Sequence, residues 1–96
     1  MEMGGLLAFL DIFVESSEMD HVIESLLKID RIEELYEVTG EYDVVTLIRC
    51  TDIEEFRDIL KNKILKIRGI RSTVSSVVLH SHKGPRSNGE AKPRGQ

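Results

Sequence analysis

The sequence contains no tryptophan and few aromatic residues of any kind. Its 96 residues include only two tyrosines and three phenylalanines: Phe9, Phe13, Tyr36, Tyr42 and Phe56. Proteins that bind single-stranded nucleic acid stack the bases on clustered aromatic side chains. The scarcity of such side chains argues against that class of function.

The main part of the chain also lacks the excess of positive charge that binding to phosphates requires. Residues 1–80 carry nine basic and sixteen acidic groups, a net charge of −7, whereas residues 81–96 carry a net charge of +3. Because so acidic a body repels phosphate, we expect no direct binding of nucleic acid by the domain itself.

Cysteines and long apolar runs are scarce as well. The single cysteine, Cys50, excludes an internal disulfide, which fits a reducing cytoplasm. The first apolar run is too short to span a membrane, and it follows Glu2 rather than a basic segment. We therefore expect a cytoplasmic protein with no membrane association.

Residues suited to catalysis or metal binding are few. Cys50 falls at the end of a predicted strand, where a small apolar filler is the simpler interpretation. His80 and His82 share one strand face, but two ligands are too few for a metal site. We expect no catalytic nucleophile, no metal and no cofactor.

The first apolar segment predicts a strand with two apolar faces. Alternate positions over residues 6–14 form one continuous apolar face: Leu6, Ala8, Leu10, Ile12 and Val14. The opposite face carries Leu7, Phe9 and Phe13. Helices of the same domain can cover one of these faces, so the other needs a second cover.

A helix and a second strand are predicted next. Ser17 is a favourable N-cap residue, and Asp20 stands in the capping-box position three residues later. Apolar residues then recur at helical spacing: Met19, Val22, Ile23, Leu26 and Leu27. This helix should end near Lys28 or Ile29, and a strand should follow over Ile32–Val38.

A glycine-containing turn separates that strand from a third one. Residues 39–43 interrupt the apolar pattern, and Gly40 is suited to a backbone conformation with positive φ. The sequence therefore predicts a hairpin turn over Thr39–Asp43. The third strand should span Val44–Cys50.

The remaining pattern predicts a second helix and a last strand. Thr51 and Glu54 have capping-box spacing, and Gly69 suits the left-handed position that closes a helix. The residues expected to face the core share helical spacing: Ile53, Phe56, Ile59, Leu60, Ile64 and Ile67. The last strand should span Ile70–His80.

The order of these elements predicts an α+β domain with the ferredoxin-like βαββαβ arrangement. Its four-stranded antiparallel sheet would carry both helices on one face. Because the first strand is apolar on its other face too, we expect two sheets to meet face to face as a dimeric α+β barrel.

The chain changes character after His80. Residues 81–96 contain three glycines, two prolines and almost nothing apolar, which predicts a disordered basic tail. The ligand-binding domain should therefore occupy residues 1–80. A basic tail can reach nucleic acid or an acidic partner, but a solvated terminus is the simpler interpretation.

Two segments resemble the effector-binding domain of the Lrp/AsnC transcription regulators, often called the RAM domain. They are Leu35–Asp43 (LYEVTGEYD) and Ile67–Leu79 (IRGIRSTVSSVVL), and the resemblance covers roughly residues 6–80. The sequence departs from typical members in two ways. It begins almost at the first strand, without a preceding helix-turn-helix domain, and it has Asp30-Arg31 where members often carry Pro-Gly.

The resemblance implies an assembly and a ligand. Family members form sheet-to-sheet dimers that assemble further into tetramers, octamers or similar rings, and a free amino acid or related metabolite binds between neighbouring dimers. By position, the ligand-contacting residues would be Gly40, Tyr42, Asp43, Thr73 and Ser75. Asp43 would accept from the ammonium group, amides near Gly40 would donate to the carboxylate, and Tyr42 would wall the cleft.

The resulting hypothesis is an amino-acid-sensing regulatory domain, not an enzyme, that acts on oligomer assembly or on a full-length Lrp/AsnC regulator. Simpler interpretations remain open at each site: Tyr42 and Asp43 also suit a plain turn, and Thr73 and Ser75 are ordinary strand residues. One alternative is a small dimeric enzyme of the monooxygenase or isomerase type, for which Asp11 and Arg49 are the inward-facing polar candidates. Another is a structural oligomer without a ligand.

Overall fold

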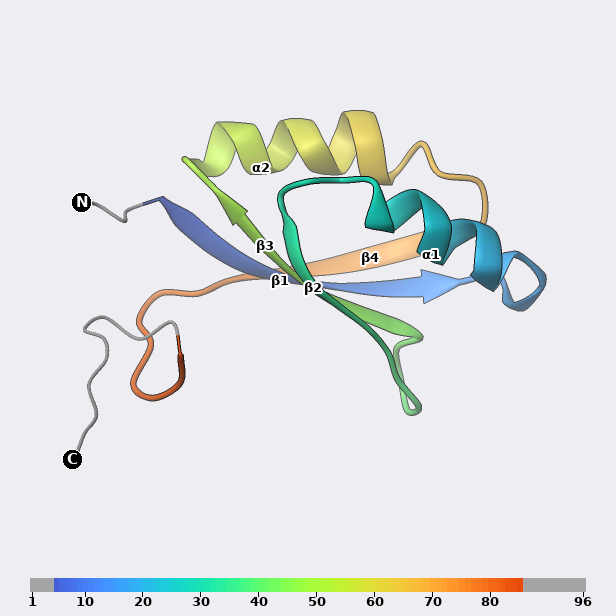
Figure 1. Cartoon of the computed structure of the whole chain (residues 1–96), viewed down its shortest axis with the longest axis horizontal. Coiled ribbons are helices and arrows are strands. Elements are labelled where there is room, and N and C mark those ends of the chain that lie inside the picture. The colour runs from blue at the N-terminus through green and yellow to red at the C-terminus, as the bar shows by residue number, and fades with distance from the viewer. Residues whose placement is uncertain (1–4, 86–96) are drawn as a thin grey trace.

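The computed structural model describes residues 5–85, which form one layer of strands and one layer of helices (Figure 1). In chain order the elements are β1 (Leu6–Val14), η1 (Ser16–Glu18), α1 (Met19–Leu27), β2 (Ile32–Glu37), β3 (Val44–Cys50), α2 (Ile53–Ile59), η2 (Leu60–Ile64) and β4 (Ile70–Val77). Here η1 is a 3₁₀ turn and η2 is a π-helical turn that extends α2. The predicted order of strands and helices is confirmed.

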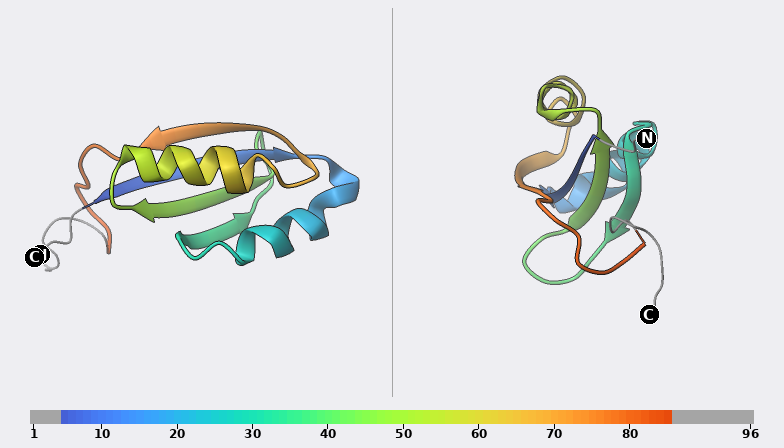
Figure 2. Two further views of the ribbon diagram at one scale, coloured as in Figure 1. Left: turned by 90° about the horizontal axis from the view of Figure 1, so that it is seen from above. Right: turned by 90° about the vertical axis from the view of Figure 1, so that its left-hand side faces the viewer.

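The four strands form one antiparallel sheet in the order β2-β3-β1-β4. β1 is a central strand, and its Leu10 lies opposite Thr46 of β3 and Ser75 of β4. Both helices lie on the same side of the sheet, with α1 beside β2 and α2 toward the β4 edge (Figure 2). This is the predicted ferredoxin-like arrangement.

The core lies between the helices and one face of the sheet. Alternating residues of β1 point into it, as the sequence pattern predicts, because successive strand side chains point to opposite faces. The buried apolar residues come from all layers: Ala8, Leu10, Ile12, Val14, Val22, Leu26, Val44, Ile48, Cys50, Phe56, Ile59 and Ile64. Thr46 is the one buried polar residue among residues 5–85, and its hydroxyl donates to the Leu10 carbonyl at 3.2 Å, which satisfies that side chain.

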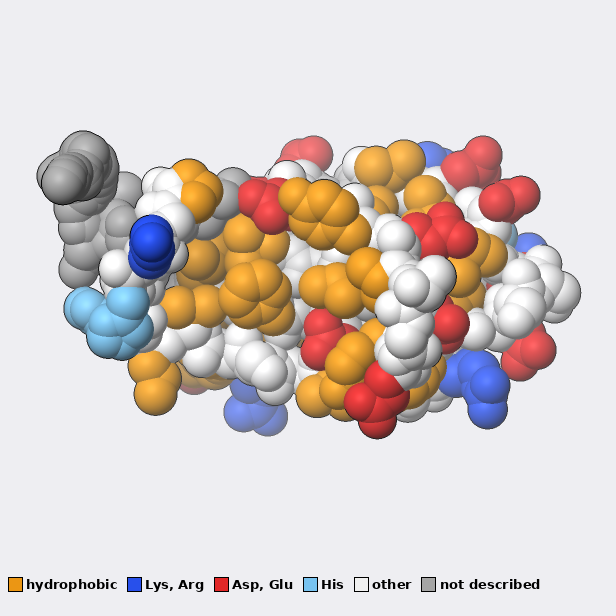
Figure 3. All heavy atoms as spheres, turned by 90° about the horizontal axis from the view of Figure 1, so that it is seen from below, with side chains coloured by type: hydrophobic (Ala, Val, Ile, Leu, Met, Phe, Trp, Pro, Cys, Tyr) orange, Lys and Arg blue, Asp and Glu red, His pale blue; other side chains and the backbone are white. Residues whose placement is uncertain are grey.

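No helix covers the other face of the sheet, which we call the open face. Apolar side chains gather on it (Figure 3). They come from β1, β2, β3 and β4: Leu7, Phe9, Phe13, Tyr36, Val45, Leu47 and Val74. Phe9, in the middle of this face, is 43% exposed. Leu47 is shielded by its neighbours at 5% exposure, whereas Tyr36 and Val74 are 55% and 42% exposed.

The start of the first helix differs from the prediction. Ser17 does not cap it: residues 16–18 form the 3₁₀ turn η1, and no side chain caps either η1 or α1. Capping by a side chain requires an extended backbone at the residue before the helix. Before α1 that residue is Glu18, whose φ of −108° and ψ of 9° are not extended. Leu27, expected in the core, is 67% exposed at the last turn of α1.

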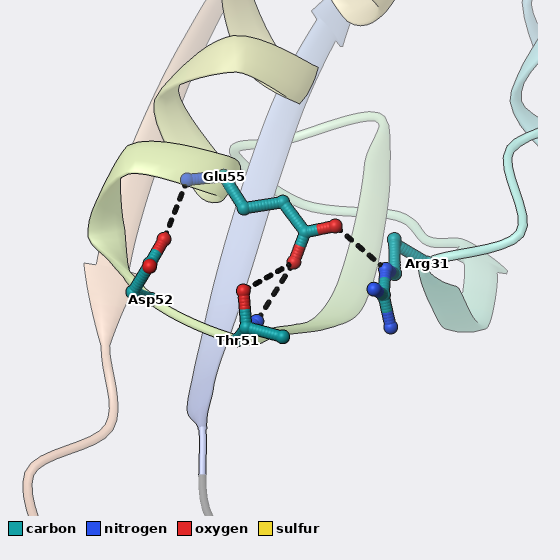
Figure 4. Close-up of polar contacts among 4 residues, drawn as sticks. All are labelled: Arg31, Thr51, Asp52 and Glu55. Atoms are coloured by element: carbon teal, nitrogen blue, oxygen red, sulfur yellow. Dashed lines mark hydrogen bonds and ion pairs between the residues drawn. The ribbon is translucent and has the colours of Figure 1, made fainter.

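The capping box of the second helix is shifted by one residue from the predicted Thr51–Glu54 pair (Figure 4). Asp52 is the N-cap, and its Oδ1 accepts from the Glu55 amide at 2.9 Å. Glu55 Oε1 accepts from the amide and the hydroxyl of Thr51, at 2.7 and 3.0 Å. Glu55 Oε2 pairs with Arg31 Nε at 2.9 Å, which ties the α1–β2 connection to the start of α2.

The second helix also ends earlier than predicted. Its last turn is the π-helical η2, in which the Leu65 amide donates to the Leu60 carbonyl at 2.8 Å. Gly69 has the predicted positive φ of 103°, but it lies beyond the helix, where a Cβ would collide with the side chain of Glu18. β4 ends at Val77, three residues before the predicted end.

The chain after β4 has no helix or strand over residues 81–85. The rest of the predicted tail, residues 86–96, lies outside the described residues. Between residues 5 and 85, no helix is both long and apolar enough to cross a membrane.

The contacts of Glu55 predict a pH-dependent contribution to stability. The hydrogen bond from the Thr51 amide is the largest cause that lowers the pKa of Glu55 from its ordinary value of 4.5. A lowered folded-state pKa contributes stability above the unfolded pKa, and this contribution is lost as the pH falls through the folded pKa. Glu55→Gln should therefore unfold more easily than the wild type near pH 7, and the difference should shrink below pH 4.5.

Urea denaturation at several pH values measures this difference. Glu54→Gln is the matched control, because Glu54 is exposed in the same helical turn and makes no side-chain hydrogen bond or ion pair with a described residue. Equal pH profiles for the two variants would contradict the role given to Glu55.

Candidate ligand-binding site

The connection between β2 and β3 is a tight turn, as predicted. It is closed by the Val38 amide, which donates to the Asp43 carbonyl at 2.9 Å. Gly40 adopts a φ of 130°, and the space where a Cβ would stand has no atom within 4 Å. The tip of the turn is therefore open to solvent around Gly40.

Asp43 anchors this turn to the end of β1. Its amide donates to the Ile12 carbonyl at 3.1 Å, and its Oδ2 accepts from the Val14 amide at 2.8 Å. The carboxylate thereby takes the place of a strand partner for β1. No described residue donates a hydrogen bond to the second carboxylate oxygen, Oδ1, which leaves one acceptor for another group.

Tyr42 is held against the sheet by a second contact. Its ring meets the Phe13 ring edge to face, with centroids 5.0 Å apart and planes at 66°. Such pairs contribute about 0.5–1.5 kcal/mol beyond the burial of their area. Phe13 belongs to the open face, so the turn and the open face share this ring pair.

The backbone of the turn supplies donors. Within the described part of the chain, no group accepts a hydrogen bond from the amides of Gly40, Glu41 or Tyr42. The turn therefore combines several unpaired N–H donors with one carboxylate acceptor and an aromatic wall. A small zwitterion requires that combination, because its carboxylate needs donors and its ammonium group needs acceptors.

Thr73 and Ser75 lie apart from this group. They pair with Ile12 and Leu10 across the β1–β4 ladder, so they lie on the helix-covered face at the β4 edge. Thr73 is half-buried and Ser75 is exposed. Because β1 separates them from β3 and its turn, they lie two strand spacings, or ~10 Å, from Asp43. One chain therefore brings together Gly40, Tyr42 and Asp43, but not the two strand hydroxyls.

The other polar candidates occupy separate places. Cys50 is buried in the core, and desolvation by burial is the largest cause that raises the pKa of its thiol. The ring centroids of His80 and His82 lie 4.6 Å apart. Residues 5–85 hold no group of three or more His, Cys, Asp or Glu side chains placed to bind a metal ion. Asp11 and Arg49 lie on the open face.

The sequence pattern did not reveal two partners of the turn. The Val14 amide is a backbone group without a side-chain signal, and Phe13 was assigned only to the face of its strand. One signal in the sequence was available: Phe13, near the end of the first strand, and Tyr42, in the turn before the third strand, are both aromatic.

The anchoring role of Asp43 predicts a loss of stability on truncation. Asp43→Ala leaves the partly buried Val14 amide without its acceptor, which should lower the free energy of unfolding by about 1–3 kcal/mol. Chemical denaturation measures this change, and hydrogen exchange at the Val14 amide should accelerate. The control is Glu41→Ala in the same turn, since Glu41 is exposed and makes no side-chain hydrogen bond or ion pair with a described residue. An equal effect of both substitutions would refute the anchor.

Comparison with known proteins places the chain in a family. The model of the Lrp/AsnC ligand binding domain matches residues 7–87. HTH-type transcriptional regulator FL11 of Pyrococcus abyssi is 38% identical over 78 residues, which make up 81% of this chain and 51% of the relative. The chain thus spans about half the length of the curated relatives it matches.

Solved structures agree with this assignment. AsnC of E. coli superposes with a TM-score of 0.80 at 26% identity, covering 83% of this chain and 54% of that one. A feast or famine regulatory protein of M. tuberculosis complexed with L-methionine superposes with a TM-score of 0.72 at 28% identity, covering 86% and 56%. With the family match over most of its length and the same fold in these structures, the chain belongs to the Lrp/AsnC ligand-binding domain family.

Proposed function

We propose that this chain is an amino-acid-sensing regulatory domain. It binds a free amino acid or related metabolite between dimers, and occupancy changes either its assembly or its contacts with a partner transcription regulator. The observation that carries the proposal is the β2–β3 turn, which offers unpaired amides, one unpaired carboxylate oxygen and an aromatic ring pair within a few residues. Relatives named as transcriptional regulators and a similar structure complexed with L-methionine support it.

The ligand's two charged groups match the two kinds of group in the turn. The ammonium group of the amino acid donates to Asp43 Oδ1, while Asp43 Oδ2 remains on the Val14 amide. The amides of Gly40, Glu41 and Tyr42 donate to the ligand carboxylate. A carboxylate already fixed by a backbone hydrogen bond loses little side-chain entropy when it takes a ligand, which favours binding.

The open face forms the dimer in this proposal. A contiguous apolar surface on a small domain is typical of an interface between subunits, and here it spans all four strands. Two copies related by a two-fold axis would cover both faces at once, because a two-fold interface uses the same patch on each subunit.

The strand hydroxyls require a second dimer. Thr73 and Ser75 lie on the β4 edge, ~10 Å from Asp43 in the same chain. We assign them to a ligand held between chains, where the β4 edge of one subunit approaches the turn of another. The ligand then stabilises the assembled state by its differential affinity for the assembled and dispersed forms.

A charge on the open face should prevent dimer formation. Phe9→Glu puts a carboxylate where two sheets would meet, so this variant should sediment as a monomer where the wild type sediments as a dimer or larger species. Leu27→Glu is the control, because Leu27 is an exposed apolar residue in the helix layer. A dimeric Phe9→Glu variant would reject the open face as the interface.

Calorimetric titration with the twenty amino acids, beginning with L-methionine, tests the ligand. At least one should bind at or below millimolar concentration, and Asp43→Ala should weaken that binding by about tenfold or more, since a charge-assisted hydrogen bond contributes about 1.5–3 kcal/mol. Glu41→Ala should bind like the wild type, and Thr73→Val and Ser75→Ala should each weaken binding by a smaller factor.

The absence of binding by all twenty amino acids at millimolar concentration would exclude a free amino acid as the effector. Equal affinities of the Asp43→Ala and Glu41→Ala variants for an amino acid would instead show that the ligand does not bind at the turn.

A further inference from the structure

A charged side chain interrupts the apolar surface of the open face. Asp11 belongs to the central strand β1 and lies between Leu10 and Ile12, which are fully buried in the core. Because successive side chains of a strand point to opposite faces, Asp11 points away from the helices. Its side chain is half-buried in the single domain.

The nearest positions around Asp11 on this face are apolar. Across the two ladders it lies opposite Val45 of β3 and Val74 of β4. Along β1, the next residues on the same face are Phe9 and Phe13. No described residue donates a hydrogen bond to the Asp11 carboxylate or forms an ion pair with it. Its charge therefore depends on water for solvation.

The cations on the neighbouring strands lie too far along the sheet to replace that water. Arg49 stands four residues beyond Val45 in β3, or ~13 Å away along the strand, and it already pairs with Glu33 at 2.8 Å. Arg71 stands at the bulge where β4 begins, three residues from Val74, or ~10 Å. A second copy could place a cation on Asp11 only by breaking the Arg49 pair or by reaching in from the end of an edge strand.

The remaining polar groups near this face are acidic or neutral. Glu34 and Tyr36 belong to β2, two strand spacings from β1, or ~10 Å. Beyond Phe13, the carboxylate of Asp43 accepts from the Val14 amide. β4 contributes two serines to the open face, Ser72 and Ser76. Hydroxyl groups can accept a hydrogen bond from a protonated carboxyl group, but they cannot neutralise a carboxylate.

Covering the open face would remove water from Asp11. A two-fold contact uses the same patch on both subunits, so each copy would bury one such side chain. An ionised carboxylate buried in apolar surroundings without a cation is strongly unfavourable, whereas the protonated group is much less so.

We propose that Asp11 binds a proton when a second copy covers the open face, so that the dimer takes up as many as two protons as it forms. On each subunit the carboxylate and one proton from the solvent become a neutral carboxyl group. This inference rests on the proposed function only for the two-fold dimer, and it is independent of the turn and of a bound amino acid.

The direction of the pH effect follows from this uptake. When the associated state binds more protons than the separate subunits, a fall in pH strengthens association. The effect ends near pH ~4, where the carboxyl group of an aspartate in water also becomes protonated. Uptake of two protons makes the association constant rise by up to about 100-fold per pH unit, and uptake of one shared proton by up to about tenfold.

Sedimentation equilibrium on the full chain at constant ionic strength tests the proposal. The dimer of the wild type should be at least about tenfold tighter at about pH 5.5 than at about pH 7.5. Asp11→Asn keeps the shape of the side chain without its charge. This variant should dimerise more tightly than the wild type at about pH 7.5, and its affinity should change little with pH.

Asp20→Asn is the matched control. It removes the same charge from an exposed position in the first turn of α1, in the helix layer. Its dimer should keep the affinity and the pH profile of the wild type, because the change lies outside the open face. Thermal unfolding at both pH values verifies that every variant is folded.

Four results would overturn the inference. A wild-type dimer that weakens as the pH falls, together with a weaker Asp11→Asn dimer, would show that Asp11 stays ionised and pairs with a cation of the second copy. Equal pH profiles of the wild type and Asp11→Asn would assign the proton to another group. A dimer of Asp11→Asn beside a wild type that is monomeric at every pH would show that the open face requires a partner sheet with a basic residue opposite Asp11. Monomers of both proteins at every pH would instead reject the two-fold dimer of the proposed function.

Discussion

The structure depends on one constraint: two helices can cover only one face of a four-stranded sheet. β1 is the strand on which this constraint acts most strongly, because it is central in the sheet and apolar on both sides. Its alternate residues from Ala8 to Val14 complete the core under the helices, and Phe9 and Phe13 are left on the open face. A domain of this size gains much of its stability from that single core, and the uncovered face makes association favourable.

The β2–β3 turn is the point where the uncovered face and the candidate site meet. Asp43 ties the turn to the end of β1 through the Val14 amide, and the Tyr42 ring contacts Phe13 of the open face. A ligand bound at the turn would touch the same ring pair that borders the proposed sheet-to-sheet interface. Occupancy and assembly would then be linked by direct contact, which is the physical basis that a coupling between two equilibria requires.

The sequence by itself determined which elements form and which sides of them are apolar. The period-2 pattern of β1, the glycine at the β2–β3 turn and the order of elements depend on local chemistry, so they were predicted correctly. Ser17 and the Thr51–Glu54 pair were wrong as caps, because capping depends on the backbone conformation of the residue before the helix. Only the tertiary structure decided that Asp43 reaches the Val14 amide and that Thr73 and Ser75 lie two strands away. These relations follow from strand register and strand order, which pair residues far apart in the chain and leave no local signal in the sequence.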